Sequence, residues 1–491
     1  MSAYQSLRGI ASEVALITST ESVLGWDQET YMPEKALGHR AQQLSYLSGK
    51  AHGLLTASRT RKLLERAEAE EPENERQKAN VQGLRRLIDR ATKLPQRFVE
   101  EEKRVTTRAK AVWAEARRQS DFSRFAPKLE MILGLARRKA ELLGYDDEPY
   151  DALLDLYERD AKTREVAALF AKMRPQLAAI ARAAVARSKE LKPGVLKGRY
   201  PCKQQQILNR EIAESLGYDF GAGRIDTTAH PFCATLGPGD VRLTTRYDET
   251  KFLSSLFGVM HEAGHGLYEQ GLPGCDYGLP GGSAASLGIH ESQSRLWENH
   301  VGRSRLFWTK WLPRAQELFP HLKKVKLDAF MQAILGSEFS FIRVEADEAT
   351  YDLHILLRFG LERRLVRGAL DVKDVPRVWN EEYRELFGRT PPDDRHGCLQ
   401  DIHWSMGGLG YFATYTLGNI NAAQLFAAAR RQRNVAAGLE RSDYAPLLKW
   451  LRENVHAHGA ALTPTRIMQQ ATGRPADPKW HIAHLRERYL G

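Results

Sequence analysis

The stretch "DETKFLSSLFGVMHEAGHGLYEQG", residues 248–271, predicts a helix that carries reactive groups on one face. Its apolar residues recur at three- and four-residue spacing until the pattern stops at Gly271. His261 and His265 are four positions apart, so both imidazoles project from the same face, with Glu262 beside them. This is the HExxH arrangement, in which two histidines bind zinc and the glutamate acts as general base toward an activated water.

A catalytic zinc site needs a third protein ligand and one open coordination position. Glu269 is excluded, because it lies about 12 Å beyond the first histidine on the same helix. The extended pattern HExxHxxGxxH is absent. The third ligand therefore comes from another element, and "SLGIHESQSRLWENH" (286–300) offers Glu291 and Glu298, seven positions apart on one helical face. Either one can bind the metal while the other supports a ligating histidine, and the residues alone do not choose.

The remaining sequence predicts a mainly α fold in a single catalytic domain, residues 1–491. Helical spacing runs from about residue 5 to 215. Around "GPGD", residues 222–250 alternate β-branched and polar residues and predict a β-hairpin or two short strands. Helices resume after Thr250, with a loop at 387–411. The domain thus has three parts, at about 1–220, 221–420 and 421–491. Helix breaks are predicted at Pro33, Pro72, Pro95, Pro127 and Pro149.

Composition narrows the function classes. The chain has 42% hydrophobic and 27% charged residues, typical of a soluble globular protein. No apolar run is long enough for a membrane span, and the N-terminus lacks the apolar segment of a signal peptide. Four scattered cysteines fit a reducing cytoplasm: Cys202, Cys233, Cys275 and Cys398. The net charge is +11, but bases and acids alternate along the helices, so no specific nucleic-acid partner is expected.

Several ordered motifs resemble the carboxypeptidase Taq family of zinc metallocarboxypeptidases. "HEAGH" (261–265) is followed 25 residues later by "HESQSRLWEN". The segments "HPF" (230–232), "DVRLT" (240–244), "IRVEAD" (342–347) and "GCLQDIHW" (397–404) match family motifs in the same order, and "WDQETYMP" (26–33) and "YDALLDLYE" (150–158) are also similar. The resemblance covers nearly the whole chain. One departure is "GYFATY" (410–415), where the family has a proline at Ala413.

The resemblance implies a largely helical catalytic domain split by a deep groove, with the metal at its floor. It also implies a cytoplasmic homodimer that removes single residues from peptide C-termini with broad specificity. The third metal ligand falls on Glu291, beside His261 and His265, which leaves Glu298 as a supporting carboxylate or a surface acid. The expected cofactor is zinc, with cobalt as a possible substitute.

Peptide hydrolysis assigns roles to further residues. Glu262 takes a proton from water and delivers it to the leaving amine. The developing oxyanion needs further donors, and related HExxH enzymes take these from a His and a Tyr on a late loop. We expect His403 first, with Tyr411 and Tyr415 as competing second donors. An ordinary packing role is equally expected for either tyrosine.

Recognition of a terminal carboxylate is best done by an arginine. Arg343 and Arg242 are the candidates, and the alternative for each is a structural ion pair with Asp347 or Asp240. His230 is expected to line the groove. Asp347 and Asp401 are further candidates for orienting the zinc-bound imidazoles.

Two other functions fit the same sequence. A dipeptidyl carboxypeptidase or an oligoendopeptidase could share the zinc site. A basic scaffold with a non-catalytic metal site is the remote alternative, disfavoured because such a site would have no use for Glu262. We also expect Gly264, between the two histidines, to permit close approach of another element, since a glycine inside a helix costs about 1 kcal/mol against alanine.

Overall fold

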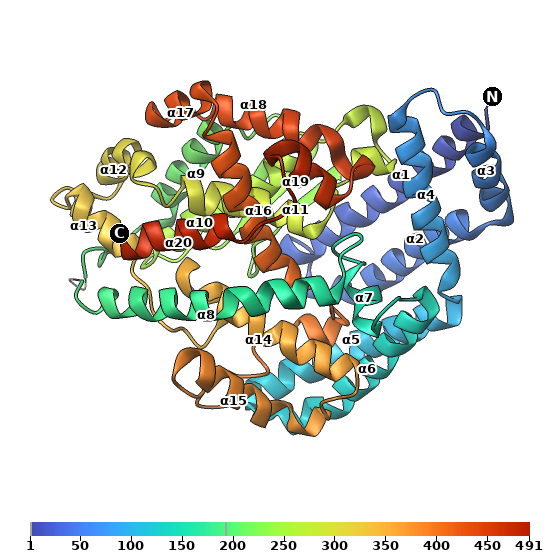
Figure 1. Ribbon diagram of the computed structural model, residues 1–491, viewed down its shortest axis with the longest axis horizontal. Coiled ribbons are helices and arrows are strands. Elements are labelled where there is room, and N and C mark those ends of the chain that lie inside the picture. Colours follow the sequence, from blue (N-terminus) through green and yellow to red (C-terminus); the bar gives the residue numbers. More distant parts are fainter. Residues whose placement is uncertain (1, 192–193) are drawn as a thin grey trace. The chain divides into compact units, whose positions relative to one another are not determined.

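The computed structural model describes residues 2–191 and 194–491, and helices dominate it (Figure 1). This confirms the predicted mainly α class with a small sheet. Contacts divide the chain into two compact units. Unit 1 comprises Met1–Thr92, Lys192–Ile334 and Asn421–Ala476; unit 2 comprises Lys93–Leu191, Leu335–Ile420 and Asp477–Gly491. The single catalytic domain with its three parts stays a prediction, as does the groove.

Unit 1 contains the small sheet and an apolar core that includes residues of the first helix. Its helices are α1 (Ala3–Thr30), α2 (Leu37–Thr56), α3 (Ser58–Ala69), α4 (Glu75–Lys93), α9 (Cys202–Leu216), α10 (Phe252–Glu269), α11 (Leu287–Arg295), α12 (Arg305–Leu318), α13 (Leu327–Ile334), α17 (Arg433–Glu440), α18 (Ala445–Asn454) and α19 (Pro464–Thr472). Of these, α1 and α10 pack against the sheet. In the part of the chain that the structure describes, no helix has both the length and the apolar character to cross a membrane.

Unit 2 contains a large apolar core with fully buried Phe98, Tyr150 and Leu353. Its helices are α5 (Gln96–Gln119), α6 (Phe122–Leu143), α7 (Pro149–Leu154), α8 (Thr163–Ser188), α14 (Glu348–Val366), α15 (Val375–Phe387) and α20 (Lys479–Leu490). Helix α16 (Ala413–Ala429) begins in unit 2 and ends in unit 1.

The sheet of unit 1 has three strands in the order β1-β3-β2. β2 (Cys233–Gly237) and β3 (Asp240–Thr245) form the predicted antiparallel hairpin, and Gly239 adopts a φ of 77°, which favours glycine. β1 (Gly223–Thr227) pairs with β3 in parallel. The sequence did not predict this third strand because a parallel neighbour is not joined by a local turn.

Four of the five predicted proline breaks fall between or at the start of helices, and one prediction was wrong. Pro127 lies inside α6. A proline there removes one backbone hydrogen bond. The helix continues because Phe125, Leu129 and Ile132 pack into the core of unit 2, and this packing outweighs the loss.

Candidate metal centre

The centre is built on α10 and the segment that begins with α11, both in unit 1. The side chain of Ser286 accepts a hydrogen bond from the Ile289 N–H and caps the start of α11. After Arg295 the chain continues in a buried π-helical turn, Leu296–Val301 (η4). Such turns are rare and often lie at functional sites. The predicted helix over 286–300 is therefore present, with a change of winding inside it.

Gly264 lets the two helices touch backbone to backbone. A Cβ at this position would lie 2.6 Å from the Gln293 carbonyl oxygen and 2.6 Å from the Ser294 Cα. Both atoms belong to α11, so neither can move without shifting that helix. At Gly258 a Cβ would meet only the Thr245 Oγ1, at an ordinary 3.6 Å. The close approach expected of Gly264 is thus seen.

The two histidines of α10 and one glutamate of α11 converge. Glu291 Oε2 lies 3.7 Å from His261 Nε2 and 3.5 Å from His265 Nε2. One ligand atom from each of the three residues lies within 4.8 Å of the others. Ligands at 2.0–2.1 Å from a tetrahedral zinc are separated by about 3.3 Å, so the trio fits a divalent ion after small side-chain adjustments.

The second nitrogen of each imidazole faces a supporting group. His261 Nδ1 lies 2.9 Å from Glu298 Oε2. His265 Nδ1 lies 2.5 Å from His290 Nδ1, and His290 Nε2 lies 2.8 Å from Glu269 Oε1. Partners of this kind fix the orientation and tautomer of metal-bound histidines. The structure thus brings Glu291 to the Nε2 atoms and Glu298 to the opposite side of the ring.

Sequence reasoning missed His290 as a contact of His265 and considered Glu269 only as a direct ligand. The signal for His290 was its place immediately before Glu291. It also missed Arg295, whose Nε donates to Glu291 Oε1 at 2.7 Å and so orients that carboxylate. Nothing in the spacing of Arg295 marks this contact in advance.

The charge states of His265 and Glu291 suit metal binding. Burial lowers the pKa of His261, but Glu291 and Glu298 outweigh it and raise that pKa, so a metal ion must displace a proton from this imidazole. Burial lowers the pKa of His265 to about 4, so its imidazole is neutral near pH 7 and has a lone pair to donate. Burial opposes ionisation of Glu291, but Arg295 and the two imidazoles outweigh it and hold its pKa well below the usual range. Burial raises the pKa of Glu262, which adjoins His261 on α10, to about 7, a value suited to a general base.

The predicted oxyanion donors lie together in unit 2. His403 begins a short helix, His403–Met406 (η8), and its Nε2 is 3.5 Å from the hydroxyl of Tyr415. The ring centroids of His403 and Tyr411 are 5.2 Å apart. Burial lowers the pKa of His403 to about 4, so near pH 7 this side chain is a neutral hydrogen-bond donor.

The two candidate arginines already have acidic partners. Arg242 makes two hydrogen bonds of 2.8 Å with Asp240, and its guanidinium lies over the Trp26 ring. Buried Arg343 pairs with Asp401 at 2.9 Å and donates to the Tyr351 hydroxyl. The structural ion pair considered for Arg242 is thus present.

Two further acids have roles other than those expected. Asp347 accepts a hydrogen bond from the Ala349 N–H and caps α14, so it neither pairs with Arg343 nor supports an imidazole. Asp401 is bound by the two buried arginines Arg343 and Arg358. His230 is exposed between β1 and β2, in unit 1.

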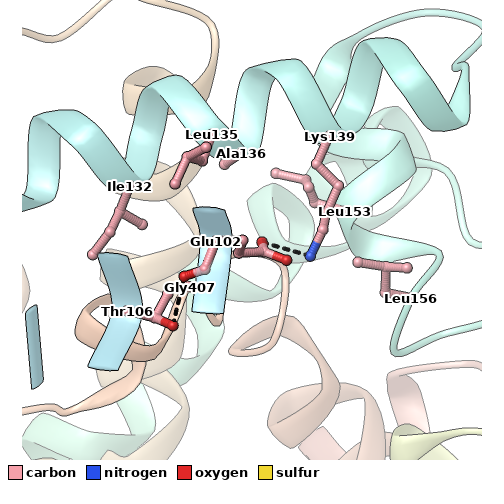
Figure 2. A pocket seen from close by; sticks show the side chains of 9 residues that line it. All are labelled: Glu102, Thr106, Ile132, Leu135, Ala136, Lys139, Leu153, Leu156 and Gly407. Atoms are coloured by element: carbon pink, nitrogen blue, oxygen red, sulfur yellow. Dashed lines mark hydrogen bonds and ion pairs between the residues drawn. The ribbon is translucent and has the colours of Figure 1, made fainter. Parts of the chain in front are cut away.

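A small pocket beside Gly407 of unit 2 is not the substrate site. Figure 2 shows helices α5 and α6 on its walls, with Lys139 directed at Glu102 in an ion pair of 2.7 Å. Its volume of about 10 Å³ corresponds to a single water molecule. The pocket therefore marks only where the loop after residue 400 lies against these helices.

Comparison with known proteins identifies the chain's relatives. The family model for carboxypeptidase Taq (M32) metallopeptidases matches residues 6–489. The chain is 40% identical to thermostable carboxypeptidase 1 of Thermus thermophilus, covering 99% of this chain and 98% of the relative. It is 37% identical to carboxypeptidase 1 of Bacillus subtilis, covering 95% and 94%. A solved M32 carboxypeptidase from Deinococcus radiodurans superimposes with a TM-score of 0.96 at 37% identity, covering 99% and 98%.

Matches of this extent show that the protein is a metallocarboxypeptidase, an enzyme that needs a metal ion. It belongs to the carboxypeptidase Taq (M32) metallopeptidase family. The alternative of a non-catalytic basic binding protein therefore does not hold.

Proposed function

We propose that this protein is a zinc carboxypeptidase that removes single residues from the C-terminus of peptides with broad specificity. The observation that carries the proposal is the convergence of His261, His265 and Glu291, with one ligand atom of each within 4.8 Å of the others. Two nitrogens and one carboxylate oxygen are a common donor set of catalytic zinc sites, which keep a fourth position open. Cobalt is a possible substitute.

Each residue of the proposed site has its own role in peptide hydrolysis. A zinc ion bound at this site would polarise the scissile carbonyl and acidify a water molecule. Glu262 takes the proton from the attacking water and gives it to the leaving amine. His403 donates a hydrogen bond to the developing oxyanion, with Tyr411 or Tyr415 as the second donor.

Substrate recognition uses the free C-terminal carboxylate. Arg343 and Arg242 are the candidates, since a guanidinium binds a carboxylate through two parallel hydrogen bonds. His230, exposed beside the strands, is proposed to contact the peptide. The expected partners are thus peptides with a free C-terminus and, from the resemblance, a second copy of the chain.

Product size tests this function against its rivals. The protein is incubated with zinc and a hexapeptide that has a free C-terminus, and separately with the same peptide amidated at its C-terminus. Mass spectrometry then gives the masses of the products. We expect stepwise loss of one residue from the free peptide only. Loss of two residues at a time would establish a dipeptidyl carboxypeptidase, and internal cleavage of both peptides an oligoendopeptidase. Metal analysis of the purified protein identifies the ion.

We also propose a cytoplasmic homodimer. All four cysteines are free in the structure, which suits a reducing compartment. Light scattering on the purified protein should give a mass near twice that of the 55.5 kDa chain. A mass equal to a single chain would contradict the dimer.

A further inference from the structure

Helix α14 of unit 2 holds the loop 401–410 at both of its ends. Arg358 and Glu362 are four positions apart on α14, so they project from the same face, and both are fully buried. Arg358 Nε donates to Asp401 Oδ2 at 2.7 Å, at the start of the loop. Glu362 accepts from Trp404 Nε1 at 2.8 Å, inside the loop, and from the Gly410 N–H at 3.0 Å, at the far end of the loop.

Glu362 is surrounded by hydrogen-bond donors. Its Oε1 faces the Trp404 indole N–H, and its Oε2 accepts from both the Gly410 N–H and the Tyr150 hydroxyl, the latter at 2.7 Å. Burial raises the pKa of Glu362 to about 7, while these donors act in the opposite direction. A buried carboxylate is costly compared with an apolar side chain of similar size, and such groups serve in some proteins to fix one conformation.

The loop has little freedom between these anchors. Gly410 has a φ of 93°, and a Cβ there would lie 2.7 Å from the backbone of Leu153 in α7. Gly407 lies against α5 and α6 (Figure 2). The two anchor residues are the immediate neighbours of proposed oxyanion donors, since Trp404 follows His403 and Gly410 precedes Tyr411.

We propose that Glu362 is a positioning residue that fixes the loop 401–410, and with it the imidazole of His403, in the orientation needed for peptide hydrolysis. This inference rests on the proposed function, because the role of His403 belongs to that function. Glu362 acts through Trp404 and Gly410 rather than by touching the substrate.

Glu362→Gln tests the inference with almost no change in side-chain volume. Each carboxylate oxygen faces a backbone or indole N–H, so either orientation of the amide sets its NH₂ against a donor and breaks one anchor. A displacement of about 1 Å costs as much as 100-fold in rate. We therefore expect kcat to fall about 10- to 100-fold while KM stays within about 3-fold and the metal content equals that of the wild type.

Glu348→Gln is the matched control. Glu348 is a buried carboxylate on the same helix, and it forms hydrogen bonds with His484, Arg488 and Tyr489 of α20. This variant should lower the melting temperature and leave kcat within about 2-fold of wild type. Equal kcat values for both variants and the wild type would overturn the inference and leave the proposed function intact. A wild-type enzyme that releases no residue from the free hexapeptide would overturn both.

Trp404→Phe supplies the second arm. The single variant removes the indole N–H that donates to Glu362 and leaves the carboxylate in place. In the double variant with Glu362→Gln, the amide NH₂ can face the position of the missing indole N–H without a clash between two donors. We expect the double variant to lose less kcat than the product of the two single losses. If Glu362→Gln does not fold, Trp404→Phe alone decides: a kcat reduced several-fold at full metal content is expected, and a wild-type kcat would overturn the inference.

Discussion

His261 lies between two carboxylates, and each one faces a different ring nitrogen. Glu291 lies toward Nε2 and Glu298 lies at Nδ1. A carboxylate at Nδ1 makes the imidazole a stronger ligand and fixes its tautomer. The burial of Glu298 opposes ionisation, but Arg295 and His261 lower its pKa to about 2, so this carboxylate is charged near pH 7.

Glu298→Gln should therefore weaken metal binding. The amide oxygen still accepts from Nδ1, but the negative charge is lost, and we expect the metal dissociation constant to rise about 10- to 100-fold. Competition with a chelator of known affinity measures it. Asp276→Asn, which removes another buried carboxylate of unit 1, paired with Arg76, is the control and should leave the constant unchanged. Equal constants in both variants would contradict the assignment of Glu298.

Glu262→Gln should separate metal binding from catalysis. The residue is buried beside His261 but is not among the three converging ligands. We expect full metal content, because no ligand is changed, and a kcat lowered about 100- to 10,000-fold, because the general base is lost. Metal analysis and single-residue release from the free hexapeptide measure the two effects. A variant that keeps its activity would require another base.

At the scale of elements, the backbone contact at Gly264 joins α10 to α11 and thereby sets the distance between the two histidines and Glu291. Gly264→Leu should push α11 away, since the nearest atoms are backbone at 2.6 Å. We expect weaker zinc retention and lower stability, measured by metal content after dialysis and by the melting temperature.

Gly258→Ala on the same helix is the control for this substitution. The Cβ of an alanine at position 258 has room, so α11 need not move and zinc retention should be unchanged. Alanine also favours the helix over glycine by up to about 1 kcal/mol. Full zinc content with normal activity in the Gly264 variant would refute the role of that glycine.

The sequence predicted the elements whose evidence is local. Periodicity located α10, and the turn "GPGD" located the β2–β3 hairpin. Contacts between segments that are distant in the sequence have no comparable local pattern. The parallel pairing of β1 with β3, the π-helical turn after Arg295 and the approach of His290 to His265 depend on how separate segments pack. The choice between Glu291 and Glu298 came from the family resemblance, since seven-residue spacing places both on one face.

At the scale of the whole molecule, buried carboxylates tie distant parts of unit 2 together. Asp352 of α14 accepts from Thr416 and Asn419 of α16 and lies 2.6 Å from His481 of α20. Burial opposes its ionisation, but His481 and the other partners outweigh this and lower the pKa of Asp352. Because the folded pKa is depressed, the stabilisation is present above pH of about 4 and is lost as the pH falls further.

Asp352→Asn should therefore reduce the stability of the folded protein near pH 7. It should also make that stability depend less on pH in the acidic range. We expect the difference in urea midpoint between wild type and variant to narrow as the pH is lowered from 5 to about 3. Both proteins are first stripped of metal with a chelator, so that proton-linked metal release does not contribute. A difference that stays constant to pH 3 would contradict this role of Asp352.

The alternation of segments between the two units has a consequence for biosynthesis. Unit 1 contains the histidine pair and Glu291, yet its last segment extends to Ala476, and unit 2 is completed only by the residues after it. A chain emerging from the ribosome has therefore made all the metal ligands long before either unit can close. Nascent chains should therefore expose unfinished apolar surface of unit 1 until the residues up to Ala476 have been made.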